Sequence, residues 1–311
     1  MAQFAGITQD MFSVYVPEKW SSNVHTLTRM RNKDAMLALC TALEGQLGEL
    51  LQGLARQASD EFPNISNNKR VEAQWVFWFR DAVARQSLAM FLERTQLSEK
   101  TIFNIALQDK HAIIAVTLKN DGIWAGLRLA QGASIDRRNL MAKLSQSWER
   151  ERALQMFAQL PENIVVRLGE TERAGRDFDL SALLGLGEQL TPEGADLTLG
   201  TFISSEQAVA LGSDLVDTLV ATLRGVLPIY RFAAWTRDND LIEVSKQLQV
   251  QKAQRRRDQA AFNAGDKVRI VSGLFSGKVG VVQDVDAKAQ VRVRVGKMSV
   301  TVGGSDLAAA S

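Results

Sequence analysis

Apolar residues recur at helical or strand spacing through most of this chain. In the first 235 residues a helical period predicts helices over 32–62, 71–95 and 134–160, and a further one that begins at 204. Alternating or continuous apolar runs predict strands over 11–16, 111–118, 123–129 and 164–168. Asn120-Asp121-Gly122 joins two of these runs, which is a strong hairpin signal. Helices and antiparallel strands without regular βαβ alternation predict an α+β body.

The last fifty residues show strand spacing only. Valine, isoleucine and methionine alternate with charged or small residues, and the alternating positions are Val268, Ile270, Val279, Val281, Val291, Val293, Val295, Met298, Val300 and Val302. Four short strands with glycine-rich turns predict a small β-barrel, which leaves no open sheet edge. We expect Gly273, Gly277 and Gly280 either to adopt backbone conformations closed to other residues or to allow close chain approach.

The run GDKVRIVSGLFSGKVGVV, from Gly265 to Val282, is similar to a motif of known protein families. Together with the QDVDAKAQVRVRV that follows, it resembles the KOW motif of NusG-type transcription factors and of a family of ribosomal proteins. The resemblance covers only this C-terminal part. It implies an SH3-like barrel, work in transcription or translation, and RNA, DNA, a nucleoprotein complex or a protein as partner.

One turn within this run leaves two interpretations open. In NusG-like barrels a Ser-Gly-Pro-Phe turn presents its aromatic residue to a protein partner, and the matching residues here are Ser272, Gly273, Leu274 and Phe275. Leucine stands in place of the proline. Phe275 is therefore either an exposed anchor for a protein partner or a core residue of the barrel.

Positive charge gathers at the C-terminal end. The whole chain has 37 Lys and Arg against 35 Asp and Glu, whereas from Asp240 onward we count 12 basic and 7 acidic residues. This distribution is typical of a module that faces a polyanion, although solvated charge alone also produces it. The candidate contact residues are Lys252, Arg255, Arg256, Arg257, Lys267, Arg269, Lys278, Arg292 and Arg294.

Three segments follow from these patterns. Residues 1–238 are expected to form the α+β body, 239–262 a basic helical linker, and 263–311 the barrel. Cys40 is the single cysteine, which excludes an internal disulfide and fits a reducing cytoplasm. We find no signal peptide and no apolar run of bilayer length, so we expect no membrane contact; the oligomeric state stays open.

Residues typical of catalysis are sparse. The two histidines, His25 and His111, lie far apart in the sequence, and no phosphate loop, nucleophile elbow or paired-histidine motif is present. Cys40 falls on the apolar face of a predicted helix and is expected to be structural. Asp136, beside Arg137-Arg138-Asn139, is expected to cap a helix amid exposed charge. A carboxylate metal site stays open, and no cofactor is predicted.

The sequence therefore favours a non-enzymatic protein that binds nucleic acid or a nucleoprotein complex through its barrel and linker. One alternative is an adaptor whose barrel contacts another protein. A second alternative is an enzyme that the barrel directs to its target. The first 235 residues show no NusG-type N-terminal domain, which separates this chain from that transcription factor outside the barrel.

Overall fold

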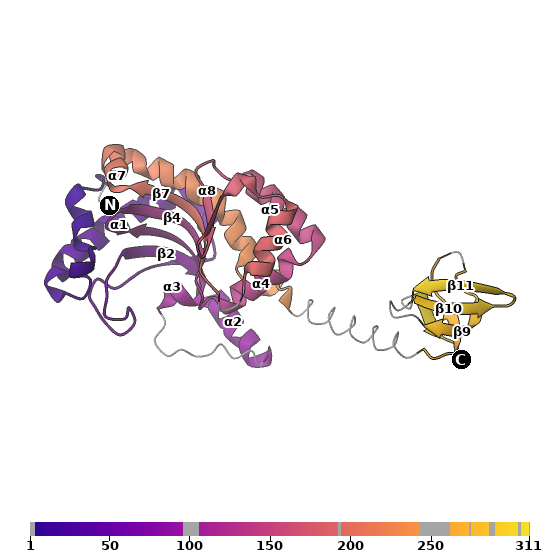
Figure 1. The fold of residues 1–311 in the computed structure, drawn as a ribbon. Helices are drawn as coiled ribbons and strands as arrows, with labels where there is room; N and C mark the ends of the chain where they lie inside the picture. The colour runs from indigo at the N-terminus through magenta and orange to yellow at the C-terminus, as the bar shows by residue number, and fades with distance from the viewer. Residues whose placement is uncertain are drawn as a thin grey trace. The chain divides into compact units, whose positions relative to one another are not determined.

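The computed structural model describes residues 4–95, 106–191, 194–242, 262–273, 275–285, 290–303 and 306–310 (Figure 1). The chain divides into two compact units, Met1–Leu241 and Ile242–Ser311, which we name the body and the C-terminal unit. Most of the linker expected over 239–262 lies outside the described residues.

A seven-stranded antiparallel sheet forms the centre of the body, in the order β1-β2-β3-β4-β7-β5-β6. Its strands are β1 (Leu54–Ala58), β2 (Gln74–Arg80), β3 (Ala112–Leu118), β4 (Gly122–Leu129), β5 (Val165–Leu168), β6 (Thr171–Ala174) and β7 (Leu197–Ser204). The predicted hairpin is confirmed as β3 and β4, closed by a 2.9 Å hydrogen bond from Lys119 N to Gly122 O. Every residue of β3 is buried, as its continuous apolar run requires.

Helices cover this sheet. They are α1 (Thr26–Leu47), α2 (Ala82–Thr95), α3 (Leu107–Lys110), α4 (Ser134–Leu144), α5 (Ser147–Ala158), α6 (Leu180–Gln189), α7 (Ser205–Leu211) and α8 (Leu215–Ala233). α1 and α8 pack against each other and against the central strands, while α4, α5 and α6 form a second group that contacts α8 (Figure 1). Leu219, Leu223 and Val226 of α8 are fully buried in the shared core. Burial of each such side chain contributes about 2 kcal/mol to stability.

The expected strand over 11–16 is wrong. Residues Gln9–Val14 form a 3₁₀ helix, in which Met11, Phe12 and Val14 are buried. Apolar residues at these spacings suit one helical turn as well as a strand. The Asn32 side chain donates a 2.8 Å hydrogen bond to Met11 O and so attaches the turn to α1.

The helix expected over 32–62 differs at both ends. α1 starts at Thr26, so Asn32 is a buried helical residue instead of the expected cap. It ends at Leu47, because Gly48 adopts φ +50°, a conformation that does not continue a right-handed helix. The later leucines that continue the helical spacing lie in a 3₁₀ turn, Gly48–Leu51, and in β1.

The helix expected over 71–95 is half wrong. Its first part is the central strand β2, and α2 begins only after Asp81, whose Oδ1 accepts a 2.9 Å hydrogen bond from Ala84 N. In the run QWVFWFR the apolar residues are consecutive, so they satisfy helical spacing without forming a helix.

Two other boundaries change. The segment 134–160 forms two helices, α4 and α5, with a break at Ser145 and Gln146, and the helix expected from 204 is likewise two helices, α7 and α8, with the 3₁₀ turn Gly212–Asp214 between them. The strand at 164–168 is confirmed as β5. The helix start at residue 204 is also confirmed: Ser204 caps α7 in a capping box with Gln207.

The C-terminal unit is a curled, five-stranded antiparallel sheet in the order β11-β10-β9-β8-β12. Its strands are β8 (Lys267–Ile270), β9 (Val279–Val285), β10 (Gln290–Val295), β11 (Met298–Gly303) and β12 (Leu307–Ala309), the last of which was not expected. The buried core consists of Val268, Ile270, Val282, Val291, Val293 and Leu307.

One strand of this unit faces the opposite way from the expectation. In β9 the buried positions are Gly280 and Val282, whereas the side chain of Val279 is 47% exposed. Gly280 allows the close approach foreseen for it, since a Cβ there would lie 2.4 Å from Val293 Cγ1. Gly273 and Gly277 adopt φ +79° and +82°, as turn glycines do.

Helices and antiparallel sheets thus combine in an α+β chain, as predicted at that level. Across the ranges that the structure describes, no helix combines the length and the apolar character needed to cross a bilayer.

Candidate functional site

Four of the predicted basic residues share the outer face of the C-terminal sheet. Lys267 and Arg269 on β8, and Arg292 and Arg294 on β10, are exposed, while the residues that alternate with them fill the core. Lys267 and Arg294 both lie opposite Val281 of the intervening β9. Two strand spacings separate them, which is roughly 10 Å. We name these four residues the basic face.

The basic face has little acidic compensation. Within 262–273, 275–285, 290–303 and 306–310, none of its four side chains forms an ion pair. Asp284, opposite Arg292 in the register of β9 and β10, is the acidic residue beside it in the sheet. Lysine and arginine side chains that the sheet presents at its surface without an ion-pair partner can contact a polyanion.

The other predicted contact residues do not belong to this face. Lys278 is exposed in the turn before β9, where its backbone N donates to Phe275 O at 3.1 Å. The four linker residues Lys252, Arg255, Arg256 and Arg257 lie outside the described residues.

Phe275 has features of both interpretations of its turn, the core residue and the exposed anchor. Its side chain is half-buried and packs against the core of the C-terminal unit. The turn around it is closed by a 3.1 Å hydrogen bond from Ser276 N to Gly273 O. Phe275 therefore contributes to the core and keeps part of its ring in solvent.

A second polar centre lies inside the body, around Asp136. The expectation of exposed, helix-capping charge is wrong here: Asp136 is buried and pairs with the buried Arg80. Its Oδ2 accepts a 2.7 Å hydrogen bond from Ala112 N, and its Oδ1 accepts one of 2.8 Å from Trp235 N. One carboxylate thus joins β2, β3, α4 and the chain after α8.

The neighbours of Asp136 are buried as well. Arg137 donates hydrogen bonds to Thr191 O (2.7 Å) and Leu129 O (3.0 Å), and Asn139 is also buried. Only Arg138 of this cluster is exposed. Local sequence shows four polar residues at a helix start and carries no signal of the distant groups that pair with them.

His111 and Cys40 have surroundings typical of structural residues. Burial, followed by the charge of Arg80, lowers the pKa of His111 to about 4, and its ring stacks on Phe79 with 5.5 Å between centroids. Burial raises the pKa of the Cys40 thiol, which keeps it protonated and unreactive. The structural role expected for Cys40 is consistent with this full burial.

Metal ligands do not gather in the described ranges. Among those residues, no group of three or more His, Cys, Asp or Glu side chains is arranged to hold an ion. The carboxylate metal site that the sequence left open therefore has no candidate ligand set in that part of the chain.

Neither a scan against protein-family models nor a search of curated proteins finds a match to this chain. Any functional assignment therefore rests on its own residues, and above all on the basic face.

Proposed function

We propose that the C-terminal unit is an SH3-like, KOW-type module that binds the phosphate backbone of nucleic acid. The observation that carries the proposal is the basic face: Lys267 and Arg294 flank Val281 on the outside of one sheet, without acidic partners among the described residues. Strands hold the side-chain stems at fixed spacing, so several cations can contact neighbouring phosphates together.

The chemistry favours phosphate contact over the reading of base edges. The described part of the face presents Lys and Arg around an aliphatic residue, with no aromatic side chain on which a base would stack. Binding of this kind is weak, sensitive to salt and largely independent of sequence. The KOW resemblance adds a role in transcription or translation to this proposal. The single free cysteine adds a cytoplasmic location.

The test is a titration of the full chain into fluorescently labelled single-stranded RNA, single-stranded DNA and duplex DNA. We expect binding at about 50 mM salt that weakens steeply by about 200 mM, because phosphate contacts release counterions. The three probes separate RNA from DNA as the preferred polyanion. Absence of binding to all three at the lower salt would overturn the proposal and favour the protein adaptor, with the exposed part of Phe275 as its anchor.

A further inference from the structure

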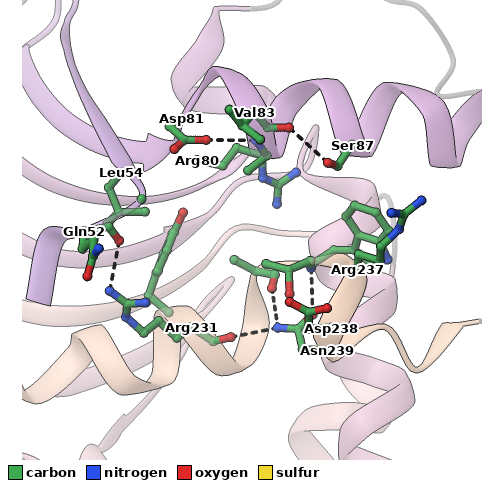
Figure 2. Close-up of a pocket in the computed structure, with 16 residues that line it drawn as sticks. Gln52, Leu54, Arg80, Asp81, Val83, Ser87, Arg231, Arg237, Asp238 and Asn239 are labelled. Atoms are coloured by element: carbon green, nitrogen blue, oxygen red, sulfur yellow. Dashed lines mark hydrogen bonds between the residues drawn. The ribbon is translucent and has the colours of Figure 1, made fainter.

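A pocket of about 480 Å³ opens in the body. It lies where the ends of β1 and β2, the first turns of α2 and the C-terminal end of α8 meet (Figure 2). Figure 2 shows Arg80 and Val83 on the side of α2, with Arg231 and Asp238 across from them. Leu54, Val83 and Tyr230 supply apolar wall. This size and lining are typical of small-molecule sites.

The lining contains buried hydrogen-bond donors that lack acceptors. Arg80 and Trp235 are 4% and 3% exposed, and in the part of the chain that the structure describes Arg80 Nε, Arg80 Nη1 and Trp235 Nε1 have no partner. Within the same described part, Asp136 accepts from Arg80 through Nη2 alone, and its oxygens also accept from Ala112 N and Trp235 N. Buried donors are normally paired, so these groups indicate a ligand that supplies acceptor oxygens.

The charges around the pocket select among such ligands. Arg80 is balanced by Asp136, and the remaining lining arginines, Arg231 and Arg237, are matched in number by Asp81 and Asp238. The pocket therefore lacks the surplus of positive charge that a phosphate dianion requires. A carboxylate has a single negative charge, and each of its two oxygens can accept more than one hydrogen bond, so it can serve all three donors.

We propose that this pocket binds a small organic carboxylate, whose oxygens accept hydrogen bonds from Arg80 and Trp235 and whose apolar part lies against Leu54 and Val83. The proposal concerns the body alone and does not depend on nucleic-acid binding by the C-terminal unit. It gives the body a ligand-binding role that its helices and sheet, read from the sequence, do not suggest.

The direct probe is the indole N–H of Trp235 in the full chain labelled with ¹⁵N. Trp235→Phe assigns its resonance, and benzoate, benzyl alcohol and inorganic phosphate are titrated separately. Benzoate is expected to shift this resonance saturably at millimolar concentration. Benzyl alcohol, which has the same ring without the charge, and phosphate, which lacks an apolar part, are expected to bind at least about tenfold more weakly, a ratio typical of one lost charged contact.

A pair of variants at the pocket wall tests the location. Val83 is 72% exposed at the start of α2, so Val83→Glu and Val83→Gln should both fold. The added carboxylate of Val83→Glu is expected to weaken benzoate binding about tenfold relative to Val83→Gln by repulsion at close range, since both variants make the wall polar and only the first adds a negative charge. No saturable shift, equal binding of benzyl alcohol, tighter binding of phosphate, or equal affinities of the two variants would each overturn the proposal.

Discussion

Asp136 is the residue on which the polar interior of the body depends. Its carboxylate pairs with Arg80, 56 positions earlier, and accepts from Trp235 N, 99 positions later. A buried ion pair contributes little net stability by itself, but loss of one partner leaves the other charged and unpaired.

Asp136→Asn tests this arrangement. The substitution preserves size but leaves Arg80 without its counter-charge, so we expect the free energy of unfolding of the body to fall by about 3–5 kcal/mol. All six tryptophans lie in the first 235 residues, so their fluorescence during urea unfolding reports the body. Glu172→Gln removes the exposed pair with Arg167 and should cost less than about 1 kcal/mol. Similar costs for the two variants would contradict the account of Asp136.

His111 should make the body sensitive to acid. Its folded pKa of about 4 lies below its ordinary value of 6.5, so the unfolded chain binds the proton more readily. Its contribution to stability is complete above about pH 6.5 and is lost as the pH falls toward 4, on the order of 3 kcal/mol. His111→Phe keeps a ring against Phe79 and removes the titration. Unfolding curves across this range should be flatter for the variant; equal slopes would show that other groups cause the loss.

The half-buried Phe275 should behave as a partial core residue. A fully buried Phe→Ala change costs about 3–5 kcal/mol, so we expect Phe275→Ala to destabilise the C-terminal unit by about 2 kcal/mol. Hydrogen exchange of peptides from β9 and β10 measures this in the full chain. Unchanged exchange together with loss of a protein partner would instead identify Phe275 as an interface anchor.

At the scale of elements, the strongly patterned segments could be predicted and the ambiguous ones could not. The turn sequence of the β3–β4 hairpin strongly favours a hairpin over other local structures, and the hairpin is confirmed. β2 has apolar residues at nearly every position, and such a run fits helix and strand equally. The end of α1 depends on the conformation of Gly48, although leucines beyond it continue the helical spacing.

β9 shows a second reason why an apolar pattern can predict the wrong face of a strand. Its inward positions are Gly280 and Val282, so one of the two carries no side chain and leaves no apolar signal. The exposed Val279 and half-buried Val281 alternate instead, which reverses the predicted face. Only the packing partner explains the glycine: Val293 occupies the space where a Cβ would be.

Gly280→Ala should therefore disrupt the pairing of β9 with β10. The new methyl group would meet Val293 Cγ1 at 2.4 Å and Arg294 O at 2.7 Å, and the backbone cannot give way without loss of the ladder. We expect complete loss of slow hydrogen exchange in the C-terminal unit. Gly296→Ala is the control, since its site is open and only its φ of +62° is unfavourable, at about 1 kcal/mol. Retained protection in Gly280→Ala would contradict this packing.

At the scale of the whole molecule, the two units differ in how far their sites follow from sequence. The basic face could be predicted because β8 and β10 alternate regularly, and alternation tells which side chains point outward. The polar centre and pocket of the body could not, because Arg80, Asp136 and Trp235 meet only after the sheet and helices have packed. Local patterns do not encode such distant pairing.

The central claim is that the basic face contacts phosphates, and the salt dependence of RNA binding tests it most directly. Arg294→Gln removes one of the two cations that flank Val281, whereas Lys119→Gln removes one from the exposed β3–β4 turn of the body. For Arg294→Gln the slope of log K against log salt should become less steep by about 0.7, the value for one contact with a single strand, and affinity should fall. Lys119→Gln should match the wild type. An unchanged slope and affinity in Arg294→Gln would contradict the account.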